Sequence, residues 1–469
     1  MGEKDFETLR ILKEEDTMEQ QVSLPEMLDA RERRATEQRR LLDTFHETLL
    51  CFTMNIAGPV KNSERIRAGF EIGKKRLEDR LRAAGIRWTL REEINEKTGN
   101  EIIYVLAQNP LSIKKITSEI EEESTLGRLF DMDVLGPDGE KADREQIGFP
   151  GRRCLICGKP AKECARSRTH TVEELQKKTT QILDEAIREA DAQEAARRAV
   201  SALLYEVCTT PKPGLVDRIN SGSHRDMTIF TFMDSSAALY PYFQACTRIG
   251  RSTAALKPEE TFAQLRRAGR RAEADMFAAT KGVNTHKGAI FSMGILCAAL
   301  GRLSRRSWRS PDVVLKECAA MTQGLVAGDF AGLTPETAVT TGQKLYLEYG
   351  ITGVRGQMEA GLPAVLEVGL PVLKEGIARG LSINDAGAAT LLALIAATTD
   401  TNLIARSDID TQQQTVAELK ELLAQTPYPG REILEELDRR FIEKNLSPGG
   451  SADLLAICYV LYFLESEDE

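Results

Sequence analysis

The chain has 469 residues, of which 42% are hydrophobic and 28% charged, which is typical of a globular protein with two or three domains. Its net charge of −9 argues against a broad nucleic-acid interface, and no run of about 18 uncharged apolar residues predicts a membrane span. The acidic first twenty residues lack the apolar core of a signal peptide, so we expect a cytoplasmic protein whose nine cysteines are mostly reduced.

The N-terminal part of the chain alternates helical and strand patterns. We predict a charged helix over residues 24–50 and a second helix over 61–85, which ends at Gly85. Strands are predicted over 51–60, which runs into a Gly-Pro turn, over 101–107, and over 128–136, where apolar residues alternate. Strands alternating with helices indicate an α/β (or α+β) domain.

The pattern changes after His170. Residues 172–199 are charged and helical, and the segments beyond them are rich in alanine and leucine, with almost no β-branched alternation. We therefore predict two domains, an N-terminal α/β (or α+β) domain over 1–175 and a C-terminal all-α domain over 176–469.

Two carboxylates mark a candidate site in the first domain. Asp131 and Asp133 are two residues apart on a predicted strand, so both should lie on one face, where they could act as catalytic ligands of Mg²⁺. Arg128 precedes them as a candidate phosphate ligand, and Lys61 follows the Gly-Pro turn, where a cation and backbone N–H groups could bind an anion. The plainer alternatives are a solvated strand end and an ordinary turn.

A cysteine-rich segment follows this candidate site. Its spacing is Cys154-x2-Cys157-x6-Cys164-x5-His170, four residues that could bind zinc, although the later spacings match no common zinc finger. We expect these residues to be structural, as packed free thiols in preference to a zinc site. The arginines of the same segment could also form an anion pocket: Arg152, Arg153, Arg166 and Arg168.

Four polar segments interrupt the helical pattern of the second domain, at residues 209–227, 282–296, 397–406 and 445–456. The first is a loop, since its prolines and glycines cannot continue a helix, and it combines carboxylates with cations, which suits a phosphorylated substrate held through a metal ion. We assign Asp217 and Asp226 as catalytic, Mg²⁺-binding carboxylates; helix capping is the alternative. The predicted substrate-binding residues are Lys212, Arg218, His224, Arg225, His286, Lys287, Asp400, Asn402 and Asp453.

The first domain resembles a known family over nearly all of residues 20–172. The motifs LDARERRATEQRRLL, FTMNIAGPVKNS, GRLFDMDV and RRCLICGKPAKECARSRTH, in this order, are similar to the citrate lyase holo-acyl-carrier-protein synthases, also called apo-citrate lyase phosphoribosyl-dephospho-CoA transferases. The resemblance implies transfer of a phosphoribosyl-dephospho-CoA group to a serine of the citrate lyase acyl carrier protein, with release of diphosphate. A metal-binding Asp-x-Asp suits such nucleotidyl transfer.

The second domain resembles the triphosphoribosyl-dephospho-CoA synthases over about residues 195–465, through TPKPGLVDR and NTHKGAIFS. The resemblance implies that ATP donates its triphosphoribosyl unit to the 2′-hydroxyl of 3′-dephospho-CoA and that adenine leaves. A carboxylate would stabilise the positive charge that develops on the ribose, and another would accept the hydroxyl proton. The chain departs from the family where Thr228 replaces an acid and Ser407-Asp408 replaces Gly-Gly, with Asp408 as a candidate for compensation.

The two resemblances together predict a bifunctional transferase that makes a prosthetic group and installs it. The implied partners are ATP, 3′-dephospho-CoA and the citrate lyase acyl carrier protein, with Mg²⁺ as cofactor and with neither nucleic acid nor membrane. The competing interpretation is a helical ADP-ribose or nucleotide hydrolase fused to a zinc-binding RNA or protein interaction module. The acidic net charge and the lack of aromatics among the arginines speak against such an RNA module.

Overall fold

The computed structural model describes residues 20–466. The chain forms two compact units, Met1–Ala190 and Asp191–Glu469, each of which is described by itself. Our expectation that the N-terminus holds no signal peptide falls on residues 1–19 and so lies outside the described residues. Among the helices of the described range, none combines the length and the apolar character that crossing a membrane requires. The cytoplasmic location stays a prediction.

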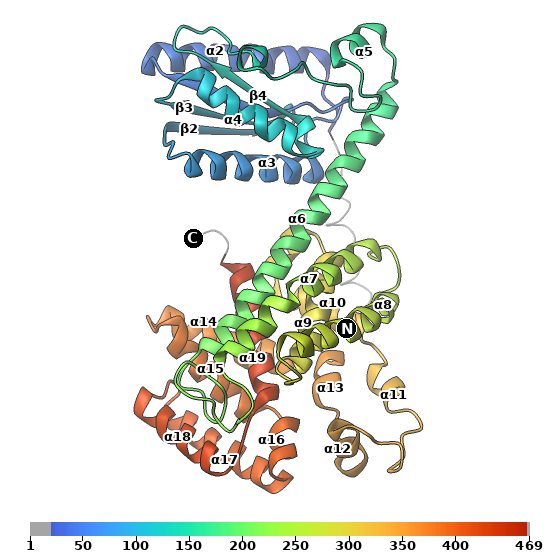
Figure 1. The fold of residues 1–469 in the computed structure, drawn as a ribbon, viewed down its shortest axis with the longest axis vertical. Helices are drawn as coiled ribbons and strands as arrows, with labels where there is room; N and C mark the ends of the chain where they lie inside the picture. Colours follow the sequence, from blue (N-terminus) through green and yellow to red (C-terminus); the bar gives the residue numbers. More distant parts are fainter. Residues whose placement is uncertain (1–19, 467–469) are drawn as a thin grey trace. The chain divides into compact units, whose positions relative to one another are not determined.

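A four-stranded sheet forms the centre of the first unit (Figure 1). The strand order is β2-β3-β1-β4, and every neighbouring pair is antiparallel, so the unit is α+β in type. The strands are β1 (Thr48–Met54), β2 (Trp88–Glu96), β3 (Gly99–Leu106) and β4 (Phe130–Leu135). The helices and 3₁₀ turns of this unit are α2 (Leu24–Phe45), α3 (Glu64–Ala83), α4 (Pro110–Glu123), η1 (Leu126–Leu129), η2 (Arg144–Ile147) and α5 (Ala161–Ser167).

Helices cover both faces of this sheet. On one face, Phe52 of β1 stacks on Phe70 of α3 and meets Phe130 of β4 edge to face, within a core that α4 also enters. On the other face, Leu41 of α2 packs against a smaller cluster that includes Val105 of β3. Figure 1 shows α2 and α3 on opposite sides of the strands. Successive side chains of β1 point to opposite faces, so Leu50 and Phe52 enter the larger core and Leu49 and Cys51 the smaller one.

Side chains of α4 satisfy the backbone at the edge strand β4. The N–H of Met132 donates to Glu121 Oε1 at 3.0 Å, and the carbonyl of Met132 accepts from Lys114 Nζ at 2.9 Å. Gly127 lies against the carbonyls of Ile120 and Glu121, where a Cβ would collide with the backbone. The edge is thus covered instead of being left open, and the glycine before β4 permits that close packing.

The regular elements in the described part of the second unit are all helices. They are α7 (Ile229–Ser252), α8 (Pro258–Ala279), α9 (Lys287–Arg302), η3 (Arg305–Arg309), α10 (Pro311–Met321), α11 (Leu325–Asp329), α12 (Thr341–Tyr349), α13 (Gly353–Glu359), η4 (Val365–Gly369), α14 (Leu370–Ala378), α15 (Ile383–Ala397), α16 (Thr401–Arg406), α17 (Ile409–Gln425), α18 (Arg431–Glu443) and α19 (Gly449–Glu465). α9, α15 and α19 are buried nearly all round and form the centre of the core.

One long helix, α6 (Val172–Cys208), belongs to both units. Ile182 and Leu183 are buried in the core of the first unit, whereas Ala195 and Ala199 are buried in the core of the second. The division between units at Ala190 and Asp191 therefore differs from the boundary of 175 that we predicted. The change from mixed to helical sequence marks the start of α6 at Val172. The core of the first unit continues into this helix as far as Ile182 and Leu183.

Candidate active sites

Asp131 and Asp133 lie on the same face of β4, as the period of two predicted. Burial alternates along the strand, with Phe130, Met132 and Val134 in the core and both aspartates partly exposed. Asp133 Oδ1 forms an ion pair with Lys141 Nζ at 2.6 Å, and Asp131 Oδ1 lies 3.4 Å from Arg152 Nη2. Each carboxylate is thus balanced by a side-chain cation at the surface of the sheet.

A third carboxylate, Glu101 of β3, lies in the same row of the sheet. Thr53 of the intervening strand β1 is the register partner of both Glu101 and Asp131, so the three side chains project from one face. Glu101 is buried and accepts from Arg34 Nε of α2 at 2.6 Å. Sequence reasoning missed Glu101, because it opens an apolar run that indicates only a strand.

A cavity of about 570 Å³ lies beside these carboxylates. Arginines dominate its polar lining: Arg128, Arg144, Arg152, Arg153 and Arg168. Arg128 donates to the carbonyl of Arg153, and Arg152 binds Glu121 Oε1 at 2.6 Å as well as facing Asp131. Asp131 and Asp133 do not line the cavity themselves, so Arg152 is the link between the cavity and the carboxylates.

Lys61, our candidate anion ligand, is placed apart from this cavity. Its Nζ donates to the carbonyl of Ile56 at 2.6 Å and so closes the turn before α3. Burial, with a smaller contribution from Arg31, lowers the pKa of Lys61. The lysine thus supports the turn and does not line the arginine-rich cavity.

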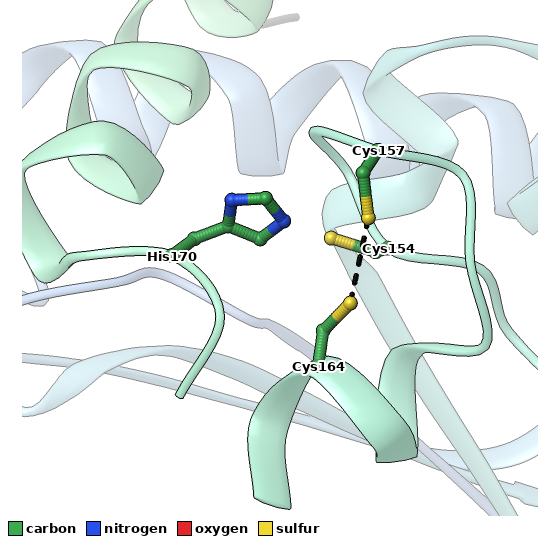
Figure 2. A group of neighbouring side chains, drawn as sticks. All are labelled: Cys154, Cys157, Cys164 and His170. Carbon is green, nitrogen blue, oxygen red and sulfur yellow. Dashed lines mark hydrogen bonds between the residues drawn. The ribbon is translucent and has the colours of Figure 1, made fainter. Parts of the chain in front are cut away.

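The four residues of the cysteine-rich segment come together in space, and we call them the Cys₃His cluster: Cys154, Cys157, Cys164 and His170. One potential ligand atom from each lies within 4.8 Å of all the others. Figure 2 shows the three thiols and the imidazole ring directed toward a common centre. None of the three cysteines forms a disulfide, and a hydrogen bond of 3.4 Å joins Cys157 Sγ and Cys164 Sγ.

The second unit contains a cavity of about 450 Å³ that draws on all four polar segments of the sequence. It brings together seven of the predicted residues: Lys212, His224, His286, Lys287, Asp400, Asn402 and Asp453. Two further charged residues line it, Glu206 from α6 and Arg406 from α16, neither of which we selected as a site residue. Both lie within helices, where a charged residue by itself carries no signal of a site.

Three carboxylates cluster in this cavity. Glu206 is buried and pairs with Lys212 Nζ, while burial raises its pKa and the lysine opposes that rise. Burial raises the pKa of Asp453 well above its ordinary value, and the charges of Glu206 and Asp400 raise it further. Asp453 accepts no hydrogen bond from any residue in the described range, and it lies where a Cβ on Gly288 would collide with its carboxylate. It is therefore the carboxylate left available to a substrate.

Asp400 has a different role, since it joins two helix ends. Its Oδ1 accepts from the backbone N–H of Asn402 at 2.9 Å, which caps α16. Its Oδ2 accepts from the N–H and the hydroxyl of Ser451, in the first turn of α19, at 2.7 and 2.9 Å. This carboxylate fixes the two helices that present Arg406 and Asp453, so its contacts are those of a helix cap.

His286 presents an unsatisfied donor. The hydroxyl of Thr285 donates to Ser235 Oγ at 2.8 Å, and Ser235 Oγ lies 2.7 Å from His286 Nδ1. Ser235 keeps one proton that it can donate to Nδ1, and in that tautomer the imidazole proton stands on Nε2. Nε2 is buried without a partner among the described residues. Burial, aided by Lys212, lowers the pKa of His286 to about 3, so the ring is neutral.

His224 is fully engaged within the protein. Its Nδ1 accepts from Arg406 Nη2 at 2.9 Å, because a guanidinium can only donate, and its Nε2 therefore donates to Ser447 Oγ at 2.9 Å. Burial and the charge of Arg406 lower its pKa to about 4, although Asp226 opposes this shift. His224 thus orients Arg406, and Arg406 is the cation at this end of the cavity.

The structure does not bring Asp217 or Asp226 into the cavity lining. Asp217 is buried, and its oxygens accept three backbone N–H bonds within its own loop, from Lys212 at 3.1 Å, Ile219 at 2.7 Å and Asn220 at 3.0 Å. Asp226 is exposed. Asp217 and Asp226 therefore do not form the expected metal-binding pair in this loop. The oxygens of Asp217 bind backbone N–H groups, and Asp226 faces solvent.

The remaining predicted ligands lie outside or at the margin of the cavity. Arg218 lines a separate hollow and donates to Asn384 Oδ1 at 2.8 Å, and Arg225 is exposed. Lys287 lines the cavity but pairs with Glu273 at 3.1 Å. The departures Thr228 and Asp408 both stand at helix N-caps, where Asp408 accepts from Thr411 N–H at 2.7 Å, and neither lines the cavity.

An α+β unit with an arginine-rich cavity and a helical unit with an acid-and-cation cavity together define a two-site enzyme for phosphorylated substrates. The family model of apo-citrate lyase phosphoribosyl-dephospho-CoA transferase (CitX) matches residues 22–186. The family model of ATP:dephospho-CoA triphosphoribosyl transferase (CitG) matches residues 192–469. The two matches fall on either side of the division within α6.

Two relatives match nearly the whole chain. It is 35% identical to the protein CitXG of Leuconostoc mesenteroides subsp. cremoris, over 94% of this chain and 97% of the relative. It is also 35% identical to the protein CitXG of Haemophilus influenzae, over 94% and 96%. A probable 2-(5''-triphosphoribosyl)-3'-dephosphocoenzyme-A synthase of Lactiplantibacillus plantarum is 43% identical over 57% of this chain and 95% of its own length.

The chain therefore belongs to the family of CitX–CitG fusions and is a bifunctional transferase of citrate lyase prosthetic-group biosynthesis. The competing interpretation, a helical hydrolase fused to a zinc-binding interaction module, is not favoured by these matches.

Proposed function

We propose that the cavity of the second unit joins the triphosphoribosyl unit of ATP to the 2′-hydroxyl of 3′-dephospho-CoA. The observation that supports this proposal is Asp453, a half-buried carboxylate beside Glu206 that has no hydrogen-bonding partner in the described range. A carboxylate whose pKa is raised suits a general base for a hydroxyl proton. Glu206, paired with Lys212, would stabilise positive charge on the ribose as adenine leaves.

The cations and donors around these carboxylates suit a triphosphate. Arg406 is held in place by His224, His286 offers its Nε2 proton, and Lys287 stands at the first turn of α9, where backbone N–H groups also favour an anion. Asp217 and Asp226 do not fit a Mg²⁺ site, because the Asp217 oxygens are already bound to the backbone. In this proposal Mg²⁺ enters as part of the ATP complex.

We further propose that the first unit transfers the phosphoribosyl-dephospho-CoA group to a serine of the citrate lyase acyl carrier protein. Asp131, Asp133 and Glu101 offer carboxylate oxygens on one face of the sheet, a donor set that fits Mg²⁺. Such an ion would neutralise the charge of a polyphosphate. Arg152 and Arg128 would bind its phosphate oxygens from the adjoining cavity, with diphosphate as the leaving group.

The test uses the full chain with ATP, Mg²⁺, dephospho-CoA and recombinant acyl carrier protein. Mass spectrometry follows the carrier protein, and chromatography follows adenine. Asp453→Asn should stop both reactions, yet carrier modification should return when the preformed triphosphoribosyl-dephospho-CoA is supplied. Asp131→Asn should release adenine normally. It should fail to modify the carrier protein, whether the nucleotide is made from ATP and dephospho-CoA or supplied preformed. Asp79→Asn, at an exposed position of α3, is the control. Release of free ribose triphosphate without a coupled product would contradict the first proposal.

A further inference from the structure

The Cys₃His cluster is assembled from separate backbone pieces, although it spans only 17 residues of sequence. Cys154 and Cys157 stand on a tight turn, in which the Cys154 N–H donates to the carbonyl of Lys159 at 2.7 Å and Gly158 takes a positive φ of 72°. Cys164 lies on α5, and His170 precedes the first turn of α6. Three local structures thus converge on one point, which chance packing of thiols does not require.

The spacing of the potential ligand atoms suits a small tetrahedral ion. Bonds of about 2.3 Å to sulfur and about 2.0 Å to nitrogen place the ligands of a tetrahedral zinc site roughly 3.5–3.8 Å apart. The four side chains lie within 4.8 Å of one another, with Cys157 Sγ and Cys164 Sγ at 3.4 Å. Small shifts of these side chains, outward for the Cys157–Cys164 pair and inward for the most distant pair, would give the geometry of a zinc site.

His170 carries the independent observation. Its Nε2 is buried and has no hydrogen-bond partner within the described residues, and Figure 2 shows this ring nitrogen directed at the thiols. Its Nδ1 faces Glu174 Oε2 at 4.0 Å. A histidine that ligates a metal through one nitrogen and turns the other toward a carboxylate is the usual arrangement of a zinc site.

The contacts of the cysteines disfavour packed free thiols. A thiol that serves as a small apolar side chain is buried among apolar neighbours, but Cys157 is exposed and still turns its sulfur to the cluster. The backbone N–H of Ile156 also points at Cys154 Sγ, 3.5 Å away, as it would toward a thiolate ligand. Both features suit sulfur atoms that bind a cation.

We propose that the Cys₃His cluster binds one structural Zn²⁺ ion. The four protein ligands complete a tetrahedral set and leave no open position for a substrate, so the ion stabilises the fold. Its effect falls on the arginine-rich cavity, because Cys154, Cys164 and His170 line that cavity. Arg152, two residues before Cys154, would be held in place against Glu121 and Asp131.

Zinc analysis of the full chain, purified without chelators, tests the proposal directly. We expect about one zinc per chain. Replacement by Co²⁺ should give the intense visible absorption of a tetrahedral thiolate site. Absence of zinc, even after refolding with Zn²⁺, overturns the proposal, as does a Cys157–Cys164 disulfide in freshly purified protein. These measurements use the wild-type chain, so they test the proposal even if a variant of the cluster fails to fold.

Variants locate the ion. Cys157→Ser changes the exposed member of the cluster and should lower the zinc content to background and the melting temperature of the first unit. Cys208→Ser, at a cysteine of the second unit, is the matched control and should keep its zinc. Full zinc in both Cys157→Ser and His170→Asn would place the ion elsewhere and overturn the assignment.

Discussion

Lys212 and Glu206 form a buried ion pair that connects the last turn of α6 to the loop that follows it. Both side chains are almost fully inaccessible, and both line the cavity of the second unit. The loop therefore reaches the site through its lysine, while the backbone of the same lysine donates to Asp217. This pair leads to our first prediction.

Lys212→Met should lower the free energy of unfolding of the second unit by about 3–5 kcal/mol, because it leaves the Glu206 carboxylate buried and unpaired. The double variant Glu206→Gln, Lys212→Met removes both charges and should recover most of that stability. Adenine release should be lost in both variants if Glu206 stabilises the ribose charge. The single variant leaves this carboxylate without its lysine, and the double variant removes the carboxylate. Chemical denaturation and an adenine assay measure the two effects. Full activity of the stable double variant would show that the pair only supports the fold.

Asp217→Ala should act on stability instead of turnover. The change removes the acceptor of three backbone N–H groups in a buried loop, which costs about 2 kcal/mol or more. Turnover of the folded protein should fall less than about 10-fold, whereas Asp453→Asn should cost about 100-fold or more, as expected for a catalytic acid–base group. Melting curves and initial rates of adenine release separate these roles. Normal melting with a large rate loss in Asp217→Ala would restore a catalytic role for Asp217.

The two neutral histidines of the cavity should make the second unit sensitive to acid. Their pKa values lie near 3 for His286 and 4 for His224, below the unfolded value of about 6.5. The unfolded chain therefore binds more protons below pH 6.5, and stability should fall as pH drops toward the folded values, by about 1.4 kcal/mol per pH unit for each histidine. Urea unfolding between about pH 7.5 and 5 measures the slope. His286→Gln should reduce the slope of unfolding free energy against pH. His46→Asn, a control at an exposed position of the first unit, should leave the slope unchanged.

The first unit should need the beginning of α6 for its core. A fragment of residues 1–190 keeps Ile182 and Leu183, which are buried against the sheet unit, whereas a fragment of 1–175 loses them. Loss of two buried aliphatic side chains costs at least about 4 kcal/mol. We expect cooperative melting and carrier modification from the longer fragment only, with preformed triphosphoribosyl-dephospho-CoA as substrate. Equal melting of the two fragments would show that the core ends before α6.

Local pattern predicted the first unit well where apolar residues alternate. The predicted strand over 128–136 is β4, and its period of two placed Asp131 and Asp133 on one face. The helix predicted to end at Gly85 is α3, and Gly85 has a φ of +70°. β2 was missed because it is an edge strand, whose exposed positions carry charges such as Arg91 and Glu93 and so hide the apolar alternation.

The candidate site of the second unit was only partly accessible to sequence reasoning. Polar segments between helices correctly indicated which loops meet, since residues from all four line one cavity. The direction of each side chain could not be read in the same way. Asp217 and Asp453 look alike in sequence, yet one binds its own backbone and the other is left available. Glu206 and Arg406 were missed because a charged residue in a helix normally faces solvent.

The distribution of cysteines gives chemical control over the two activities. All nine lie in the described range, and Cys157 is the one that is exposed; those of the second unit are buried or, at Cys208, half-buried. Alkylation needs an accessible free thiol, so once a chelator has removed the proposed zinc ion, a mild electrophile should modify Cys157 long before the thiols of the second unit. On the proposed roles, the alkylated protein should still release adenine from ATP but lose carrier modification, which would make the activated nucleotide obtainable from the unmutated protein.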